Sequence, residues 1–498
     1  MESRVDLSHL IRRAQRQFPS SAPIEDDVRA VTLAGAVDRA ERLANALEGL
    51  GPPGAPVAIL SENRVEYVET DLALALGRRV RVALNERLAE EDFAYAIEDC
   101  GAGVLVHSAR HAETAALLAA RTGVRALGID DPAGYEALIA AAPATPRVRE
   151  GGEEETAWIS YTSGTTGRPK GVVLSRRAIR HVTVNLLLEL GPVRPGEQIV
   201  LAQPLSHGAG YFVLPWLLCG AGLIIQRRFD PEAMAAAAAR ERVGALKVVP
   251  AMLPPLLELR SPPRPRRVIY GGAPIGRPLL EASLERLGPV LVQIYGQSEA
   301  PMTLTYLDEA SHLGEDDRRL SVGRPWRSVA LEARGAEGER LGAGEIGEIH
   351  VSGDHMMSGY LGMPETTGEV LGGDGWLATR DMGHVDERGY VHLLGRLDEM
   401  IISGGFNVAP REVELCLLEH PGVEECVVFG AADERWGQAI WAAVVSADPG
   451  LAEADVIGFS RPRLGFRAPR KVVFVPDIPK NAYGKLDRTR LMAAVGEA

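Results

Sequence analysis

The segment YTSGTTGRPKG, residues 161–171, gathers residue types that bind phosphate groups. Its glycines leave backbone N–H groups exposed, and its hydroxyl and ammonium side chains are further hydrogen-bond donors. A run of strand-forming residues, TAWISY at 156–161, leads into it. This pattern predicts a loop that wraps around a mobile polyphosphate, with candidate ligands at Thr162, Ser163, Gly164, Thr165, Thr166, Gly167 and Lys170.

This loop differs from the P-loop of nucleotide-binding kinases and GTPases. A P-loop reads G-x-x-x-x-G-K-[ST] and leads directly into a helix. Here Pro169 stands in place of the second glycine, and Gly171 stands in place of the serine or threonine. The spacing therefore disfavours a P-loop enzyme. A glycine-rich surface turn would explain the glycines alone, but not the whole string.

Further motifs follow the loop in order: PLSHGAGY (204–211), YGGAP (270–274), YGQSEAP (295–301), GWLATRDMGHVDERGYVHLLGR (375–396) and PKNAYGKLDR (479–488). Together with the loop they resemble the motifs of the adenylate-forming (ANL) superfamily, in its acyl- and aryl-CoA synthetase branch (the AMP-dependent synthetases and ligases). The resemblance covers nearly the whole chain. It implies an acid–thiol ligase that forms an acyl-AMP and then an acyl-CoA thioester, using ATP, Mg²⁺ and coenzyme A.

Matched residue by residue, the resemblance implies a site for each part of ATP. The adenine would lie between the segment Gly272-Ala273-Pro274 and the ring of Tyr295, followed by Gly296, because glycine allows close approach and an aromatic ring offers a stacking face. Asp381 would accept hydrogen bonds from the ribose hydroxyls, and Arg396 would donate to the ribose. The loop from Ser163 to Lys170 would hold the β- and γ-phosphates.

The catalytic residues implied by the resemblance are Glu299, Ser298 and Lys485. Glu299 would carry Mg²⁺, which prefers one or two carboxylates together with phosphate oxygens. Ser298 would offer its hydroxyl to the α-phosphate, and Lys485 would bridge the α-phosphate and the substrate carboxylate. Two anions must meet in line, so fixed positive charges are the main catalytic requirement. A general base is not needed, because a carboxylate is already ionised near neutral pH.

The acyl pocket is expected around His207, Gly208, Ala209 and Met302, with Met252 and Thr303 as further lining. The small side chains leave room for a bulky or extended hydrophobic carboxylic acid. No arginine stands at an obvious point for a second carboxylate, which disfavours a dicarboxylic acid. No matched acidic residue would hold the ammonium group of an amino acid.

The resemblance also implies a hinge at Asp398 and a channel for coenzyme A at Gly404 and Gly405. Glycines in a strand suit the close approach of a ligand. One position departs from the family pattern: Arg380 replaces the glycine that usually precedes the ribose-binding aspartate. This departure bears on the thiolation step more than on adenylation. A standalone adenylating enzyme that passes its acyl-AMP to a carrier protein or a partner enzyme therefore stays open.

The apolar pattern indicates the elements that must position these residues. Strand-like runs alternate with helical stretches in the N-terminal part of the chain, which is typical of α/β layers with parallel sheets. From 321 to 394 the sequence pattern changes to short strand-like runs separated by glycines. The strand-like runs are PVAIL (56–60), AGVLVH (102–107), EQIVLA (197–202), ALKVV (245–249) and RRVIYGG (266–272), and the helical stretches include Val37–Leu50 and Pro231–Arg242.

The fold class expected is therefore α/β in two domains. A large N-terminal AMP-binding domain over 1–396 contains two layered α/β subdomains and a β-barrel-like subdomain at about 321–394. A small mobile α+β domain over 397–498 carries Lys485. A lysine on a separate domain delivers its charge only when the domains close, and closure excludes water from a hydrolysable acyl-AMP.

Composition limits the partners and the location. The formal charge of −13 argues against a nucleic-acid partner, because binding to DNA depends on basic side chains. The N-terminus has no apolar signal segment, and the uncharged stretch at 208–225 contains a proline and four glycines, so a buried helix–turn–strand is expected there rather than a membrane span. The expected location is cytoplasmic. The oligomeric state is open, with a homodimer as one option.

Two other classes of function share these motifs. A luciferase-like oxygenase would consume oxygen or emit light, and a catalytically lapsed nucleotide-binding scaffold would bind ATP without acid-dependent exchange of pyrophosphate. The presence of Lys170, Glu299, Asp381, Arg396 and Lys485 argues against the scaffold.

Overall fold

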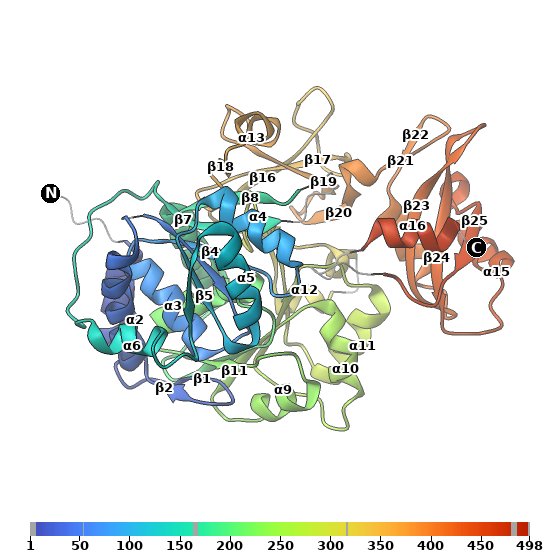
Figure 1. Cartoon of the computed structure of the whole chain (residues 1–498). Helices are drawn as coiled ribbons and strands as arrows, with labels where there is room; N and C mark the ends of the chain where they lie inside the picture. Colours follow the sequence, from blue (N-terminus) through green and yellow to red (C-terminus); the bar gives the residue numbers. More distant parts are fainter. Residues whose placement is uncertain (1–5, 53, 163–167, 315–316, 480–485, 497–498) are drawn as a thin grey trace.

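The computed structural model describes residues 6–52, 54–162, 168–314, 317–479 and 486–496, which form four β-sheets and the helices around them (Figure 1). Their α-helices are α1 Leu7–Gln17, α2 Leu33–Leu47, α3 Val65–Leu76, α4 Glu90–Cys100, α5 Ala112–Thr122, α6 Tyr135–Ala141, α7 Arg176–Glu189, α8 Val213–Leu218, α9 Pro231–Ala238, α10 Leu253–Glu258, α11 Arg277–Leu287, α12 Glu309–His312, α13 Pro364–Val370, α14 Pro410–Leu417, α15 Glu453–Leu464 and α16 Arg488–Gly496.

The first sheet has the strand order β18-β8-β7-β4-β3-β5-β6. Its central strands are parallel, and β8 and β18 add antiparallel strands at one edge. Parallel strands covered on both faces read as continuous apolar runs, as PVAIL does in β3. The bounds are β3 Pro56–Leu60, β4 Val80–Ala83, β5 Val104–His107, β6 Arg125–Gly128, β7 Thr156–Thr162, β8 Lys170–Ser175 and β18 Gly359–Tyr360.

The second sheet has the order β15-β14-β13-β12-β11-β9-β10-β1-β2 and is parallel from β13 to β1. Its buried strands are again apolar, as in QIVL of β9 and GLII of β10. The bounds are β1 Ile24–Glu25, β2 Ala30–Val31, β9 Gln198–Leu201, β10 Gly222–Ile225, β11 Val243–Val248, β12 Arg267–Gly271, β13 Leu291–Tyr295, β14 Thr305–Leu307 and β15 Arg324–Pro325.

Helices and sheets alternate as layers. One continuous hydrophobic cluster joins α2, α3, α7 and α8 to the facing sides of both sheets. A second cluster places α9, α10 and α11 on the outer face of the second sheet, and a third places α4 and α5 on the outer face of the first. These layers confirm the expected α/β class.

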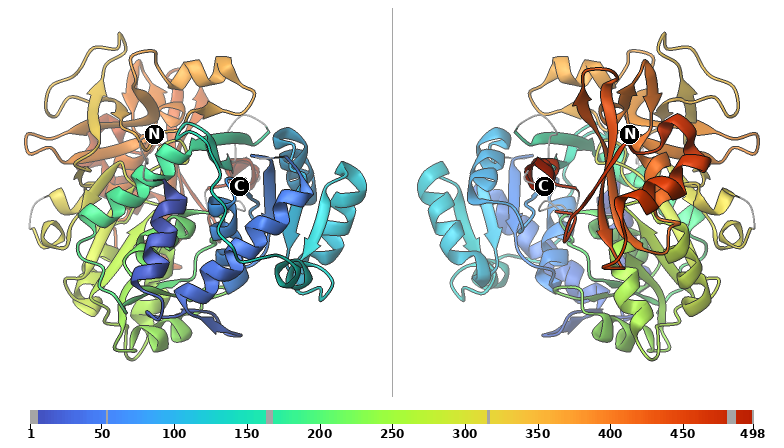
Figure 2. Two further views of the ribbon diagram at one scale, coloured as in Figure 1. Left: turned by 90° about the vertical axis from the view of Figure 1, so that its left-hand side faces the viewer. Right: turned by 90° about the vertical axis from the view of Figure 1, so that its right-hand side faces the viewer.

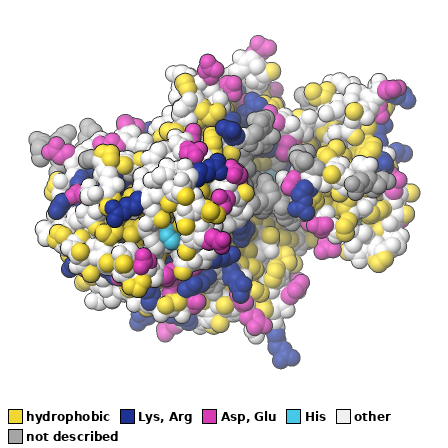
Figure 3. All heavy atoms as spheres, viewed as in Figure 1, with side chains coloured by type: hydrophobic (Ala, Val, Ile, Leu, Met, Phe, Trp, Pro, Cys, Tyr) yellow, Lys and Arg dark blue, Asp and Glu magenta, His cyan; other side chains and the backbone are white. Residues whose placement is uncertain are grey.

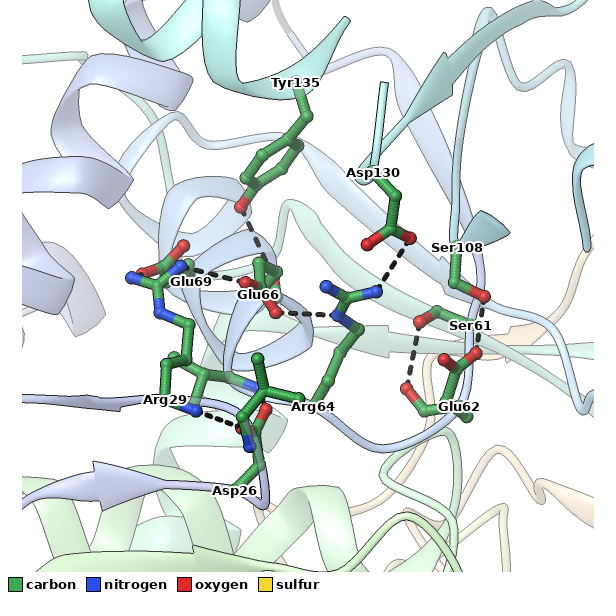
Figure 4. A network of polar contacts seen from close by, with 12 residues as sticks. Asp26, Arg29, Ser61, Glu62, Arg64, Glu66, Glu69, Ser108, Asp130 and Tyr135 are labelled. Carbon is green, nitrogen blue, oxygen red and sulfur yellow. Dashed lines mark hydrogen bonds and ion pairs between the residues drawn. The ribbon is translucent and has the colours of Figure 1, made fainter. Parts of the chain in front are cut away.

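A polar network ties the two sheets together at one end (Figure 4). Arg29, in the turn between β1 and β2, donates to Glu66 at 2.9 Å and to Glu69 at 3.0 Å, both on α3. Arg64 then joins Glu66 at 2.7 Å to Asp130 at 2.9 Å, beyond the end of β6. Burial alone would raise the pKa of Glu66, but the two arginines bring it below its usual value. The carboxylate therefore stays ionised and holds the layers in register.

The remaining sheets are antiparallel or mixed. The third has the order β16-β17-β19-β20, and lies in the region where a β-rich texture is expected. Its bounds are β16 Ala330–Arg334, β17 Gly347–Ser352, β19 Leu377–Val385 and β20 Val391–Arg396. The fourth has the order β22-β21-β24-β23, with β25 pairing with β24; its bounds are β21 Ile401–Ser403, β22 Phe406–Val408, β23 Val423–Asp433, β24 Gly437–Ser446 and β25 Lys471–Phe474.

The fourth sheet and α14, α15 and α16 gather at one side of the molecule, in orange and red (Figures 1 and 2). Their two hydrophobic clusters contain only residues from 401 onward. A single 3₁₀ turn, Leu397–Glu399, connects β20 of the third sheet to β21 of the fourth. This part of the chain therefore has a core of its own and one short covalent connection to the body.

The ends of several elements differ from the sequence expectation. The helix expected over Val37–Leu50 begins at Leu33, because the Thr32 side chain accepts a hydrogen bond from the Gly35 backbone N–H and caps the first turn. The segment at 208–225 forms a 3₁₀ turn over Gly208–Phe212, then α8 and β10, as expected. In the part of the chain that the structure covers, no helix is both long and apolar enough to cross a membrane.

Candidate active site

Two neighbouring parallel strands bring the expected adenine-binding segments to one edge of the second sheet. β12 ends at Gly271, which lies opposite Ile294 on β13, so Gly272 and Tyr295 follow at the same level. Ligands bind at the carboxyl ends of such strands in open α/β sheets. Gly272 has a φ of 85°, and the nearest atom to a Cβ built there is 3.7 Å away, on Val249. The position needs glycine for its backbone and leaves open space beside it.

Asp381 is the centre of a hydrogen-bond cluster at this edge. It lies opposite Arg396 in the β19–β20 pair, and Arg396 Nη1 donates to Asp381 Oδ1 at 2.9 Å and to the Thr379 carbonyl at 3.0 Å. The Tyr295 hydroxyl donates to Asp381 Oδ2, and Gln297 Nε2 donates to the same oxygen at 2.6 Å. Three residues expected to bind the nucleoside, one from the motif at 295–301 and two from the motif at 375–396, therefore meet in space.

The electrostatics of this cluster fix the charge on each member. Burial and the neighbouring Asp381 carboxylate both raise the pKa of Tyr295 well above its usual value, so its hydroxyl stays a donor. Burial lowers the pKa of Arg396, but Asp381 outweighs this effect and leaves it raised. Asp381 is only 8% exposed and accepts three donors. A carboxylate has about four acceptor sites, so the three donors among the described residues leave one for a ribose hydroxyl.

Glu299 lies beside the end of the glycine-rich loop. The Tyr360 hydroxyl, on β18, donates to Glu299 Oε1 at 2.8 Å, and Lys170 Nζ lies 5.0 Å from the centroid of the Tyr360 ring. β18 pairs with β8, which begins at Lys170, so the sheet itself sets this arrangement. Among the described residues, Glu299 Oε2 has no hydrogen-bond partner. A carboxylate oxygen that no described residue occupies suits Mg²⁺ together with phosphate oxygens, so the chemistry of Glu299 fits the metal.

Some of the expected ligands lie outside the described residues. These are Ser163, Gly164, Thr165, Thr166, Gly167 and Lys485. The two ends of the loop are described: Thr162 closes β7 and is paired with Lys170 on β8. Ser298 immediately precedes Glu299, and its side chain is half-buried.

The expected acyl-pocket residues lie next to the nucleotide segment. A Cβ on Gly208 would lie 3.6 Å from Met302 Cε, and a Cβ on Gly296 would lie 2.3 Å from the Met302 backbone nitrogen. Met302 has a φ of 59°, unusual for a side chain of this size. Gly296, Met302 and Gly208 therefore form a contiguous wall. Ala209 is buried, and Ser206 Oγ lies 2.9 Å from His207 Nδ1.

Met252 and Thr303 were expected as further lining of the acyl pocket. Met252 packs with Val248 and Leu253 in the cluster on the outer face of the second sheet, away from the cluster that contains Ala209. Thr303 Oγ1 accepts a hydrogen bond from Asn185 Nδ2 at 3.2 Å and is fully buried against α7.

Arg380 and Asp398 form an ion pair at the connection between the third and fourth sheets. Arg380 Nη2 donates to Asp398 Oδ1 at 2.6 Å, and both side chains are partly exposed. Arg380 has a φ of 60°, in the left-handed region that favours glycine. The backbone thus explains why glycine is the usual residue here, and the ion pair shows what arginine adds.

Gly404 and Gly405 form the turn between β21 and β22, with φ values of 61° and 82°. A Cβ on Gly404 would lie 2.8 Å from Trp436 Cε3, and the Gly404 N–H donates to the Trp436 carbonyl at 2.8 Å. Glycine is therefore required at 404 by its backbone and by Trp436, whatever ligand approaches.

A separate cavity of about 970 Å³ opens at the carboxyl ends of β3 and β10. None of the expected site residues lines it. Its charged lining is balanced between five arginines and five acidic residues: Arg64, Arg110, Arg227, Arg228, Arg240, Glu25, Asp26, Asp27, Glu62 and Asp130. Basic and acidic side chains are likewise interspersed on the face of the molecule in Figure 3.

Comparison with known proteins supports the resemblance seen in the motifs. A family model of the AMP-binding enzymes matches residues 11–361, and a model of the C-terminal domain of these enzymes matches residues 412–485. Feruloyl-CoA synthase of Amycolatopsis sp is 39% identical over 489 residues, which cover 96% of each chain.

Two solved structures share the fold over nearly their whole length. The amide bond synthetase McbA from Marinactinospora thermotolerans matches with a TM-score of 0.89 and 33% identity, covering 98% of this chain and 99% of McbA. ATP-bound MatB from Rhodopseudomonas palustris matches with a TM-score of 0.88 and 30% identity, covering 97% and 98%; apo MatB, with coverage of 98% and 99%, matches at 0.80. The expectation from the motifs is confirmed: the chain belongs to the AMP-binding enzymes of the adenylate-forming superfamily, in the branch of the acyl- and aryl-CoA synthetases, whose members use ATP, Mg²⁺ and coenzyme A.

Proposed function

We propose that this chain is an ATP-dependent carboxylate–CoA ligase that adenylates a bulky or extended hydrophobic acid, of the aromatic kind named for feruloyl-CoA synthase. The observation that carries the proposal is the cluster around Asp381, where Tyr295 and Arg396 meet one carboxylate beside the carboxyl ends of β12 and β13. This cluster has the donors and acceptors that a nucleoside needs. The wall formed by Gly208, Gly296 and Met302 adjoins it and leaves room for the acid.

Each group in the cluster has a role in binding ATP. Gly272 leaves space for the adenine, with Ala273 and Pro274 after it, and Tyr295 offers its ring. Asp381 accepts from the ribose hydroxyls, while Arg396, held by Asp381 and the Thr379 carbonyl, donates to the ribose. Gln297, which the motif comparison did not single out, keeps the Asp381 carboxylate oriented through its bond at 2.6 Å.

The reaction requires positive charge around the α-phosphorus as pyrophosphate leaves. Lys170 at the end of the loop contributes one cation, and the loop hydroxyls and Ser298 contribute donors. Mg²⁺, when bound by Glu299 and phosphate oxygens, supplies further positive charge at the phosphates. Tyr360 holds Glu299 in place for this role. Lys485 is proposed to bridge the substrate carboxylate and the α-phosphate, so that the two anions approach in line.

We also propose two domains, 1–396 and 397–498, with the second rotating about Asp398 between adenylation and thiolation. The separate hydrophobic clusters of the C-terminal part and its single short connection support this boundary. The higher TM-score to ATP-bound MatB than to apo MatB supports an arrangement of the two parts like that in the ATP-bound protein. Gly404 and Gly405, in the turn between the first two strands after the hinge, would then line the path of coenzyme A.

Replacement of Arg380 by glycine is expected to favour the rotated state. The partly exposed ion pair with Asp398 contributes up to about 1 kcal/mol, which is about fivefold in the equilibrium between the two arrangements. The rate of thioester formation from supplied acyl-AMP, divided by the rate of acyl-AMP formation, should rise by up to about fivefold at low salt.

The matched control for this prediction is Arg380→Lys, which keeps the positive charge and the left-handed backbone strain. In Arg380→Lys the ratio of half-reaction rates should stay close to the wild-type ratio. High salt should raise the ratio of half-reaction rates in the wild type towards that of the glycine variant, because salt screens an exposed ion pair. An unchanged ratio in Arg380→Gly at low salt would show that the ion pair does not restrain the hinge.

The acceptor of the acyl group is tested directly with the wild-type enzyme. A panel of aromatic, fatty and dicarboxylic acids is incubated with ATP and Mg²⁺, with and without coenzyme A, and pyrophosphate and free thiol are measured. Aromatic acids should give acid-dependent pyrophosphate release and loss of thiol in equal amounts. Pyrophosphate release without loss of thiol would favour the alternative in which acyl-AMP passes to an amine, as the name of McbA implies for that enzyme, or to a carrier protein.

A further inference from the structure

Lys247 is a buried cation that the functions described above do not use. It lies on β11, is 2% exposed, and donates from Nζ to the Val248 carbonyl at 3.0 Å. Nζ also lies 5.7 Å from the centroid of the Phe212 ring. Within the described ranges it forms no ion pair. Lysine is rarely fully buried unless it is paired, because the loss of hydration is costly.

Arg81 shows how this fold treats a buried cation with a structural role. It is 1% exposed, and its guanidinium donates to Asp71 at 2.7 Å, to the Tyr67 hydroxyl at 3.2 Å and to the Leu205 carbonyl at 2.8 Å. That charge has one acidic partner and two further acceptors, and the Trp158 ring lies 4.2 Å away. Lys247 has one backbone carbonyl and the face of one ring, so most of its donor capacity is unused.

The position of Lys247 points to the acyl pocket. It is the penultimate residue of β11, between Leu201 on β9 and Ile269 on β12, at the carboxyl end of the parallel sheet. Phe212, which its ammonium group faces, closes the same 3₁₀ turn that begins with Gly208. An acid whose carboxylate reaches the nucleotide and whose body passes Gly208 would therefore extend towards Nζ.

Resting on the proposed function, we propose that Lys247 Nζ binds the phenolic hydroxyl at the far end of an aromatic carboxylic acid, and that it thereby selects hydroxylated aryl acids. The surroundings suit an aromatic ring because they are apolar: Ala209 and Phe212 follow Gly208 in the same turn and belong to the hydrophobic cluster between the sheets, and Gly208 itself has no side chain. Nζ would then fix the orientation of the ring, as polar atoms do in pockets that are mostly apolar.

The chemistry favours a phenol over a second carboxylate. Burial lowers the pKa of Lys247 to about 7, so a large fraction of the side chain is a neutral amine at neutral pH. A phenol, with a pKa of about 10, stays protonated and can donate its O–H to that amine. This hydrogen bond brings no net charge into the core. A carboxylate would require a buried ion pair, with the desolvation of both groups.

The test compares two acids that differ only in the hydroxyl: 4-hydroxycinnamic acid and cinnamic acid. In Lys247→Met, kcat/KM for acid-dependent pyrophosphate release should fall by about 10- to 100-fold for the hydroxylated acid, through KM, and by less than about threefold for cinnamic acid. Methionine keeps the length and bulk of the lysine stem, so the fold should persist. The melting temperature should be unchanged or higher, because an underused polar group leaves the core.

The matched control is Lys471→Met, a lysine whose Nζ lies 4.4 Å from the Trp441 ring in the fourth sheet. This variant should leave unchanged the ratio of kcat/KM for 4-hydroxycinnamic acid to kcat/KM for cinnamic acid. A test without mutation uses 4-methoxycinnamic acid, which cannot donate a hydrogen bond from the para oxygen. The wild type should use it about tenfold or more less efficiently than the 4-hydroxy acid.

Two results would overturn the assignment of Lys247 while leaving the proposed function intact. One is an equal loss of kcat/KM for both acids in Lys247→Met, which indicates a structural role. The other is a wild type that uses the hydroxy and methoxy acids equally well. A wild type that releases no pyrophosphate in response to any acid would instead refute the proposed function, and the assignment with it.

Discussion

Replacement of Asp381 by asparagine is expected to lower kcat/KM for ATP by about 100-fold. The carboxylate accepts hydrogen bonds from Tyr295, Gln297 and Arg396 in a largely buried position. An amide keeps one acceptor oxygen and turns an N–H group towards the remaining donors. Two charge-assisted bonds, at about 1.5 kcal/mol each, would be lost from the ribose site, and about 3 kcal/mol corresponds to about 100-fold.

The experiment measures pyrophosphate release at varied ATP and saturating acid. Asp374→Asn is the matched control, because Asp374 also pairs with an arginine at 2.9 Å, Arg334, on the third sheet but is exposed. It should keep kcat/KM for ATP within about twofold of the wild type. The Asp381 variant should retain its KM for the acid. If kcat/KM for the acid falls while kcat/KM for ATP is unchanged, the cluster does not hold the nucleotide.

The strands of the body could be predicted from the sequence because they are covered on both faces. PVAIL forms β3 with the same bounds, since a strand buried between two helical layers has no polar position. Helix ends were harder to place. The Thr32 cap starts α2 four residues before the apolar pattern indicates, and the helix expected over Pro231–Arg242 ends at Ala238.

The motifs identified residues but not their partners. Tyr295, Asp381 and Arg396 carry recognisable sequence context, whereas Gln297 and Tyr360 act through contacts that only the fold creates. Tyr360 reaches Glu299 from β18, a two-residue strand at the edge of a sheet whose next strand, β8, lies far earlier in the chain. No local sequence pattern predicts such a contact.

Lys247 is another residue whose contacts could not be predicted from the sequence. The run ALKVV was expected to be an apolar strand of a parallel sheet, and β11 is buried throughout, its lysine included. Only the structure shows that the ammonium group lies inside and faces Phe212. Arg380 was recognisable as a departure from the family pattern, but its ion pair with Asp398 depends on the turn between two sheets.

Replacement of Lys485 by alanine is expected to lower the rate of adenylation by about 100-fold or more, while thiolation of supplied acyl-AMP survives. Lys485 lies outside the described residues, and the prediction rests on the motif PKNAYGKLDR. A preorganised cation at the site where charge develops typically contributes this much to kcat. Once the acyl-AMP exists, its carboxylate no longer needs to be brought to the phosphate, so the second half-reaction does not require this lysine.

The two half-reactions separate a catalytic role of Lys485 from a structural one. Acid-dependent exchange of pyrophosphate reports adenylation, and thioester formation from acyl-AMP and coenzyme A reports the second step. The control is Lys471→Ala, because Lys471 is a half-buried lysine on β25, in the same sheet as β24. This substitution should alter neither rate by more than about twofold. If Lys485→Ala loses both half-reactions together, the C-terminal part has been disrupted as a whole. If it adenylates at the wild-type rate, the charge that drives the release of pyrophosphate comes from elsewhere, and Lys170 becomes the residue to examine.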